Sequence, residues 1–199
     1  MIPKSIDVST PILPVFAERY SGVSFDPERL VTREQLLALS EAARWSPSCF
    51  GDQPWRFLIC DRNSNPAAWD KAFACLLEGN QGWCRNAPVL VISCCDTLLS
   101  RNDKPNPFGA YDTGAAALAF SLQAAALGLM THQMGGFVAD TARGLFGIPE
   151  RYKPLAMMAL GYQLPQDRLP EALRERELAP RTRAALDTRF FGGDWNQGL

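Results

Sequence analysis

The chain has 199 residues, of which 47% are hydrophobic and 21% are charged, as in an ordinary soluble globular protein. This length fits one domain with a sizeable core, so we expect a single domain over residues 1–199. The formal net charge of −1 gives no broad field that would attract nucleic acid or an anionic membrane. We therefore expect neither partner, and any bound anion must be held by a few well-placed basic groups.

Targeting signals and metal motifs are not evident. Met1–Thr10 has one lysine and no long apolar run, unlike a secretory signal. The alanine-rich stretch 114–130 falls short of the roughly 20 strongly apolar residues that a membrane span needs. The six cysteines form no CxxC pair, and the single His132 cannot complete a zinc set with them. We expect a cytoplasmic protein with reduced, structural thiols and no bound metal.

The first predicted helix has a clear start and a clear end. Thr32 and Gln35 have the spacing of a capping box, in which each side chain satisfies a backbone N–H of the first turn. Apolar residues then recur at helical spacing, which predicts a helix over 33–45. Ser46-Pro47 ends it, because proline disfavours helical geometry in the residue before it.

Several further elements follow in chain order. Trp55–Cys60 is predicted to be a short strand, residues 61–66 a turn, and residues 67–77 a helix. The apolar, β-branched run 88–94 is typical of a buried strand. Residues 155–162 are similar, although their methionines and alanines also suit a helix.

The last predicted helix is unusual in being apolar on all sides. Asp112 is expected to cap it, and it continues to about Leu127 with Gly128 near its end. Such a helix should be buried on every side. A central core helix is favoured over a dimer seam, and both can hold. The tail, residues 164–199, is charged and then aromatic, so we expect an arm that wraps over its own domain or over a partner.

The chemistry must come from an organic cofactor. Neither a G-x-G-x-x-G nor a G-x-x-x-x-G-K-[ST] loop is present, and there is no G-x-S-x-G elbow or H-E-x-x-H helix. The only histidine, His132, follows an apolar helix and is best interpreted as structural. An enzyme with so little acid, base and metal equipment needs a cofactor.

Ordered motifs along the chain resemble one family. Residues 41–57 read E-A-A-R-W-S-P-S-C-F-G-D-Q-P-W-R-F, which resembles the nitroreductase signature A-A-R-x-A/S-P-S-x-x-N-x-Q-P-W-x-F. Upstream, residues 19–25 resemble the family's R-R-S-x-R-x-F motif. Downstream, Gly128-Leu129, Gly135-Gly136-Phe137, residues 159–162 and Arg181-Thr-Arg183 match further elements in the right order. The resemblance covers roughly residues 16 to 195.

The resemblance implies an α+β, three-layer α/β/α fold with a central, mostly antiparallel sheet. It also implies a homodimer that builds two FMN sites at its interface, with the C-terminal arm exchanged between subunits. The chemistry would be ping-pong hydride transfer from NAD(P)H through flavin N5 to a small acceptor, such as a nitroaromatic or a quinone. No catalytic side chain is expected.

By the same resemblance, the FMN phosphate is held by Arg19, Arg181 and Arg183, with Tyr20 and Ser21 in the same motif. A phosphate dianion needs charge-assisted donors, and arginine offers a planar fork for it. Without the motif order, these would be ordinary solvated arginines.

The flavin ring is assigned to two further groups of residues. Asn80 falls where an amide contacts the pyrimidine edge, although a turn asparagine is the alternative. The Gly135-Gly136 backbone would face N5 and O4. The resemblance also implies that the flavin is contacted from the second subunit by Pro47, Ser48 and Cys49, with Gln53 in the same signature. Phe108, in a predicted lid over residues 105–111, would contact the substrate.

Two positions depart from the family pattern. Val23 stands where Arg or Lys is usual, and Gly51 replaces an asparagine. They keep open a flavin-binding storage or sensing protein without turnover. Flavin cleavage, reductive dehalogenation and azoline oxidation are alternatives within the family, and a cofactor-free structural dimer is the least favoured.

Overall fold

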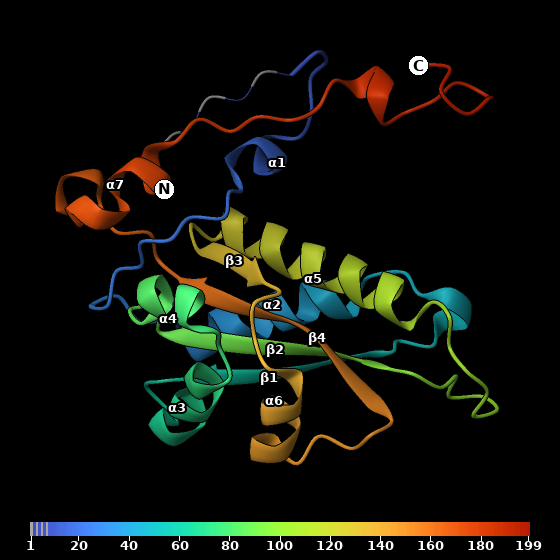
Figure 1. Ribbon diagram of the computed structural model, residues 1–199, viewed down its shortest axis with the longest axis horizontal. Helices are drawn as coiled ribbons and strands as arrows, with labels where there is room; N and C mark the ends of the chain where they lie inside the picture. The colour runs from blue at the N-terminus through green and yellow to red at the C-terminus, as the bar shows by residue number, and fades with distance from the viewer. Residues whose placement is uncertain (1, 3, 5, 7) are drawn as a thin grey trace.

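The computed structural model describes residues 2, 4, 6 and 8–199. Within this part of the chain, four strands form an antiparallel sheet in the order β1-β2-β4-β3 (Figure 1). They are β1 (Trp55–Asp61), β2 (Val89–Asp96), β3 (Met130–Met134) and β4 (Tyr152–Gly161). The three strands predicted from the sequence are confirmed, including the run 155–162 that also suited a helix. The short strand β3 was not predicted.

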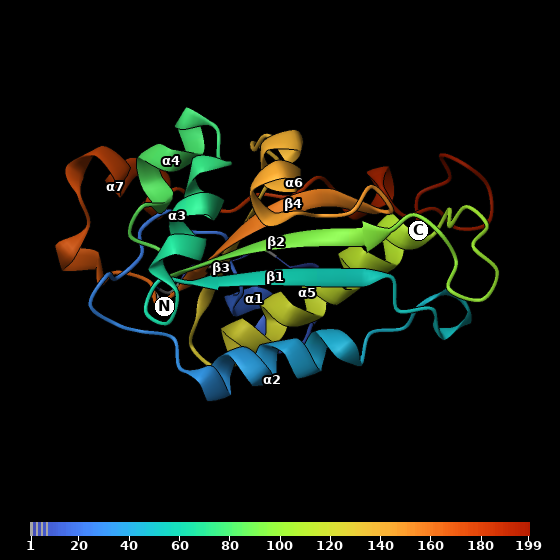
Figure 2. The same ribbon diagram turned by 90° about the horizontal axis from the view of Figure 1, so that it is seen from below.

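Helices cover both faces of the sheet. Figure 2 shows α3, α4 and α6 on one face and α2 and α5 on the other. The helices of the described residues are α1 (Pro14–Glu18), α2 (Arg33–Arg44), α3 (Pro66–Ala74), α4 (Glu78–Cys84), α5 (Gly109–Ala126), α6 (Ala139–Phe146) and α7 (Glu171–Leu178). Short 3-10 turns occur at Cys49–Gly51, Gln166–Arg168 and Leu186–Thr188. This is the predicted α+β, three-layer α/β/α fold.

Strand β2 lies at the centre and faces both cores. Its side chains alternate between the two faces, as the pleat of a strand requires. Leu90 and Ile92 belong to the core that includes Trp69 and Trp83 of α3 and α4. Val89 and Val91 belong to the core under α2 and α5. Because both faces are covered, the strand is buried along its whole length and is mostly apolar instead of alternating.

The capping box of α2 is confirmed. The Thr32 hydroxyl accepts a hydrogen bond from Gln35 N at 3.2 Å, and Gln35 Oε1 accepts one from Thr32 N at 3.0 Å. The helix begins at Arg33 and ends at Arg44, one residue before the predicted end. Gln35 also donates to the Tyr162 hydroxyl at 2.8 Å, so this helix start is connected to the end of β4.

The predicted helix over 67–77 is too long. Helix α3 ends at Ala74, and α4 begins at Glu78 after a break in the chain direction. Leu76 pairs with Phe137 in an isolated bridge, and Leu77 N donates to Gly136 O at 3.0 Å. The helix stops because its last predicted residues pair with the loop before α6.

Two predictions about α5 are wrong. The helix begins at Gly109, so Asp112 lies in its first turn and does not cap it. The buried Asp112 carboxylate instead accepts a hydrogen bond from Cys49 N. Nor is the helix buried on every side, because Tyr111, Gly114 and Leu118 are exposed on one face, Tyr111 by 80%. The other face covers the sheet and contacts α2.

The tail after α7 extends along the molecule and packs little against it. It runs past the β3 edge of the sheet, beside the chain that leads into α1 (Figure 1). Phe191 and Trp195 contact each other, with ring centroids 5.0 Å apart, but Trp195 is 81% exposed. No helix within the described ranges has both the length and the apolarity to cross a membrane. The prediction for Met1–Thr10 lies partly outside the described residues, since residues 1, 3, 5 and 7 are not described.

Candidate cofactor-binding site

Four of the predicted phosphate-binding residues come together from the two ends of the chain. Arg19 follows α1 directly, and its guanidinium donates to Ser21 Oγ at 3.2 Å. Arg181 donates to the carbonyl oxygen of Arg19 at 3.0 Å and to that of Lys4 at 2.8 Å. Burial lowers the pKa of Arg19, and the charges of Arg181 and Arg183 lower it further. These residues therefore form the cationic cluster: Arg19, Ser21, Arg181 and Arg183.

The cationic cluster forms no ion pair with an acidic side chain among the described residues. None of the ion pairs formed within this part of the chain includes Arg19, Arg181 or Arg183. The buried Nε of Arg181 has no hydrogen-bond partner there. Like charges held together without a counter-charge raise the free energy of the protein. A bound anion would lower it, so the residues present fit a phosphate group.

Tyr20 lies beside the cluster, but its side chain points into the protein. Its buried hydroxyl donates to the carboxylate of Glu177 and accepts a hydrogen bond from Gln163 Nε2 at 3.1 Å. Burial raises the pKa of Tyr20, and the hydrogen bond to Glu177 raises it further. The hydroxyl is therefore engaged within the protein.

Val23, the departure from the expected basic residue, is also a core residue. Its side chain is 1% exposed and lies in the core between the sheet and α4. Its backbone N–H donates to Glu177 at 2.6 Å. The position thus contributes packing and a backbone donor in place of a phosphate charge.

Asn80 and Gly136, both predicted to contact the flavin ring, lie against each other. Asn80 Nδ2 donates to Gly136 O at 2.9 Å, and Asn80 Oδ1 accepts a hydrogen bond from Trp83 Nε1 at 3.2 Å. A Cβ on Gly136 would lie 2.6 Å from Asn80 Nδ2, so a side chain here would have to displace the Asn80 amide. Gly135 has open space at the same point. The amide of Asn80 keeps one N–H free of these contacts.

Pro47, Ser48, Cys49 and Gln53 form a separate group in and around the 3-10 turn after α2. Gln53 N donates to Ser48 Oγ at 3.0 Å, and Cys49 N donates to Asp112 Oδ2 at 3.0 Å. Gly51 has a φ of +66°, in the left-handed region that glycine and asparagine tolerate best. This explains why glycine can replace the family's asparagine here.

Phe108 lies with this second group, immediately before α5, and is 47% exposed. Of the lid predicted over 105–111, residues 109–111 form the first turn of α5. The preceding loop is joined to the Cys49–Gly51 turn through Asp52. Its carboxylate accepts hydrogen bonds from Ser100 N at 2.9 Å and from Asn106 Nδ2 at 3.3 Å.

The two groups lie toward opposite ends of the molecule. Phe108 precedes α5 directly, and the Cys49–Gly51 turn is bonded to the first turn of α5 through Cys49 and Asp112. Helices α4, which contains Asn80, and α7, which precedes Arg181 in the sequence, lie toward the other end of α5 (Figure 1). An 18-residue helix is about 27 Å long, at roughly 1.5 Å per residue. Within one subunit, the predicted site is therefore divided into two parts.

His132 is structural, as predicted. Its ring lies 4.4 Å from that of Trp83, and its Nδ1 lies 2.9 Å from the carbonyl oxygen of Gly22. Burial lowers the pKa of His132, so the neutral imidazole is favoured. Its described contacts are thus made within the protein.

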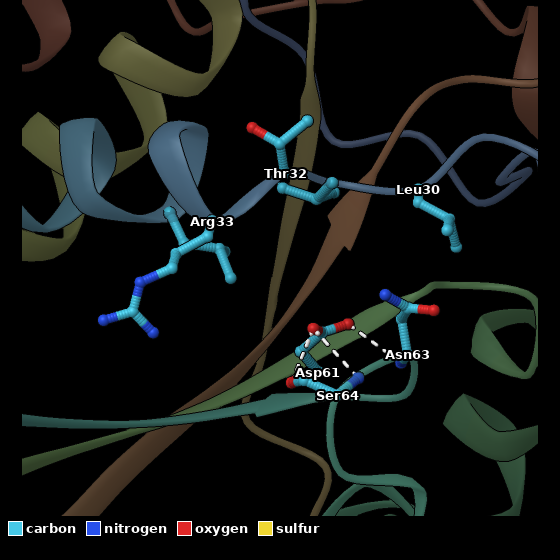
Figure 3. A pocket seen from close by; sticks show the side chains of 8 residues that line it. Leu30, Thr32, Arg33, Asp61, Asn63 and Ser64 are labelled. Atoms are coloured by element: carbon cyan, nitrogen blue, oxygen red, sulfur yellow. Dashed lines mark hydrogen bonds between the residues drawn. The ribbon is translucent and has the colours of Figure 1, made fainter.

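A hollow of about 390 Å³ lies elsewhere, between the start of α2 and the turn after β1. Figure 3 shows Leu30, Thr32 and Arg33 on one side of it and Asp61, Asn63 and Ser64 on the other. Asp61 accepts hydrogen bonds from Asn63 N and from Ser64 N and Oγ. Its carboxylate is thus used within the turn, and none of the predicted site residues lines this hollow.

Sequence reasoning missed Glu177, which contacts both Tyr20 and Val23. Its helix, Glu171–Leu178, has the sequence E-A-L-R-E-R-E-L, and nothing in that pattern distinguishes the buried glutamate from its exposed neighbours. The only sequence signal was its position four residues before Arg181.

Comparison with known proteins agrees with this geometry. A protein of 15.4 kDa from Mycolicibacterium smegmatis, described as uncharacterized, is 31% identical over 149 residues, which cover 72% of this chain and 99% of that protein. The oxygen-insensitive NAD(P)H nitroreductase of Salmonella typhimurium is 25% identical, with 80% and 95% of the two chains covered. A crystal structure of an oxidoreductase containing FMN superposes with a TM-score of 0.87, at 33% identity and 96% coverage of both chains.

The family itself follows from the sequence model of the nitroreductase family, which matches residues 16–162. That range includes Arg19, the 41–57 signature and Gly136, and it spans the whole sheet. This chain belongs to the nitroreductase family.

Proposed function

We propose that this chain is an FMN-dependent oxidoreductase that passes reducing equivalents from NAD(P)H to a small acceptor, such as a nitroaromatic compound or a quinone. The observation that carries the proposal is the cationic cluster, which gathers three arginines without an acidic partner among the described residues. The FMN-containing oxidoreductase at 33% identity supports the same cofactor.

In this proposal, Arg19, Arg181 and Arg183 hold the phosphate of FMN, and Ser21 adds a hydroxyl. Arg181 already donates hydrogen bonds to the carbonyl groups of Lys4 and Arg19. Its main role is therefore to hold the N-terminal segment against the C-terminal tail and to add positive charge. Arg19 and Arg183 supply the guanidinium forks that match phosphate oxygens.

The flavin ring would lie against Asn80 and the Gly135-Gly136 loop. The Gly136 carbonyl is held by Leu77 N and by Asn80, which fixes the direction of the loop. The N–H groups of both glycines are then available to the polar edge of the ring. Asn80 contributes its remaining N–H to the same edge.

The proposed active unit is a homodimer, because the predicted ring contacts are divided between the two ends of α5. A two-fold axis would bring Pro47–Gln53 and Phe108 of one subunit to the Asn80 end of the other. The exposed α5 face and the aromatic tail are the surfaces that would then be buried. Arm exchange by residues 164–199 is part of this proposal.

Bound FMN would supply a ring that takes up a hydride at N5 and gives it to the next molecule stacked on the same face. The chain would hold that ring, keep water from one side and leave the other open, which favours ping-pong kinetics. No acid or base side chain is required, and the single histidine, which is partly buried, contacts Trp83 and the Gly22 carbonyl.

The test is to purify the protein and to examine it for bound FMN by absorbance and by mass spectrometry of the released cofactor. We expect yellow protein whose flavin is bleached by NADH or NADPH without oxygen and restored by a quinone. Colourless protein that FMN cannot reconstitute would overturn the proposal.

The alternative is a flavin-binding storage or sensing protein, favoured by the buried Val23 in place of a basic residue. Bound flavin that neither nucleotide reduces would support this alternative. Steady nucleotide consumption with a quinone would instead support the reductase over flavin cleavage, dehalogenation or azoline oxidation.

A further inference from the structure

Glu177, in the last turn of α7, is a fully buried carboxylate with 0% exposure. We propose that Glu177 is a positioning residue for phosphate binding, which joins the Arg19–Ser24 segment to the start of the C-terminal arm. The proposal deepens the function given above and rests on it, because the phosphate is that of FMN.

Both oxygens of the Glu177 carboxylate are saturated by donors from two other parts of the chain. Oε2 accepts hydrogen bonds from Val23 N at 2.6 Å and from Ser24 N at 3.1 Å. Oε1 accepts one from the Tyr20 hydroxyl and one from Gln163 Nε2 at 2.5 Å. A buried charge is tolerated only when it is compensated in this way. These four hydrogen bonds therefore hold the carboxylate of Glu177 in one position.

Gly22 shows independently how closely the two segments are fitted. A Cβ at this position would lie 2.6 Å from Glu177 Oε1, 2.8 Å from the Tyr20 hydroxyl and 2.3 Å from Met130 Sδ. No side chain can be added there without displacing the carboxylate. Because Gly22 has no side chain, the Glu177 carboxylate can approach the 19–24 segment closely enough to accept from Val23 N and Ser24 N.

The position of Glu177 in the chain relates it to the cationic cluster. Val23 and Glu177 are 154 residues apart in the sequence, so the carboxylate joins segments that nothing local holds together. Arg19 and Ser21 flank Tyr20 on one segment, while Arg181 and Arg183 follow Glu177 on the other. Fixing both segments to one carboxylate sets the distance between the two pairs of phosphate donors.

The test compares two ligands, FMN and riboflavin, which differ only in the phosphate. Their affinities are measured by fluorescence titration for the wild type, Glu177→Gln, Tyr20→Phe and Arg183→Ala. In Glu177→Gln, the amide NH₂ replaces one carboxylate oxygen. It then faces N–H or O–H donors and cannot accept their hydrogen bonds. We expect FMN affinity to fall about tenfold, with riboflavin affinity unchanged within about twofold. Tyr20→Phe, which removes one donor, should give a smaller loss of the same kind.

Asp96→Asn is the matched control. Asp96 is also a buried carboxylate, but it accepts from Arg151 and Leu98 N, away from the cluster. It should leave the FMN-to-riboflavin ratio unchanged. If Glu177→Gln does not fold, as judged by circular dichroism, then Tyr20→Phe decides the question by the same ratio.

Other outcomes overturn the proposal in distinct ways. Equal losses for both ligands would mean that Glu177 only stabilises the fold. Tighter FMN binding in Glu177→Gln would mean that its charge merely opposes the phosphate. If Arg183→Ala lowers the ratio and neither Glu177→Gln nor Tyr20→Phe does, the positioning role fails and the proposed function stands. If the wild type itself does not prefer FMN, the phosphate site of the proposed function fails as well.

Discussion

At the scale of single residues, the cationic cluster is the main feature of the proposed phosphate site. Its guanidinium groups lie close enough for Arg181 and Arg183 to lower the pKa of Arg19, after burial has already done so. Clusters of this kind occur where an anion is to be bound, because solvated arginines gain nothing from such proximity. The prediction that Arg19, Arg181 and Arg183 act together depended on their motif order, and the fold provides the proximity.

Arg183→Ala should weaken FMN binding by about tenfold or more, since a hydrogen bond to a charged group contributes about 1.5–3 kcal/mol. Titration at two salt concentrations checks this, and the difference from wild type should shrink at high salt. Arg189→Ala is the control, because Arg189 is an exposed arginine of the same tail whose guanidinium donates only to the neighbouring Thr188 carbonyl. A similar loss in both variants would argue against a specific phosphate contact.

The buried thiols should make stability fall in alkaline solution. Burial raises the pKa of the Cys84 thiol to about 12 and that of the Cys60 thiol to about 11, above the ordinary value of about 9. Above pH 9 the unfolded chain therefore loses thiol protons that the folded chain keeps, so the free energy of unfolding falls as the pH rises toward 12. Below pH 9 both states are protonated and this contribution is complete.

Cys84→Ala removes one of these groups, so its free energy of unfolding should decrease less steeply between pH 9 and 11. Urea titrations at pH 7, 9 and 10.5 measure the slope. At pH 7 to 8 the two proteins should differ by a constant amount, which reflects packing alone. Parallel curves up to pH 10.5 would show that Cys84 ionises equally in both states.

At the scale of elements, the sequence predicts those with local signals and misses those created by tertiary contact. The capping box of α2 and the apolar runs of β1, β2 and β4 are local, and all were found. Helix α3 was predicted too long because Leu76 and Leu77 pair with a loop 60 residues away. The start of α5 was misplaced because the Asp112 carboxylate serves Cys49 instead of its own helix.

The loop before α6 provides an element-scale prediction. Gly136→Ala should lower the melting temperature, because the new Cβ would lie 2.6 Å from Asn80 Nδ2 and push the amide from its place. The cost of such overpacking is about 1–3 kcal/mol. Gly135→Ala meets nothing within 4 Å and is the matched stability control. Thermal unfolding of the two variants decides, and equal melting temperatures would contradict the predicted contact.

At the scale of the whole molecule, the exposed α5 face and the aromatic tail point to an assembly. Tyr111, Gly114 and Leu118 recur at helical spacing on the side away from the sheet. From the sequence, this helix was predicted to be buried on all sides, which is wrong for a single subunit. A second subunit would cover the stripe, which is why the sequence pattern alone could not separate core from interface.

Leu118→Glu should therefore shift the protein from dimer to monomer and weaken flavin binding with it. Analytical ultracentrifugation over a range of concentrations measures the shift. Leu145→Glu on α6 is the control, because Leu145 is exposed by 41% and Leu118 by 45%, but Leu145 lies on the other face of the sheet. A monomeric wild type, or a dimer unaffected by Leu118→Glu, would contradict the proposed interface.

The residues of the candidate site could be predicted from the sequence, but their separation into two groups at opposite ends of one subunit could not. Motif order identified Asn80 and Gly136, and the fold brings their side chain and backbone into contact. Glu177 had no sequence signal beyond its position before Arg181, because its role depends on donors 154 and 157 residues away. Relations of this kind belong to the folded chain and leave no local pattern.

The connection between Tyr20 and Glu177 also bears on the order of events during synthesis. Val23 is synthesised 154 residues before its partner carboxylate, and the two tail arginines follow that carboxylate. Contacts of such long sequence separation are slow to form, because loop-closure entropy opposes them. In the proposed function, the phosphate-binding groups are incomplete until residue 183 has been made, so FMN would be bound only after that point. A chain truncated before residue 177 would keep its sheet residues and lack two of the three arginines of the cationic cluster.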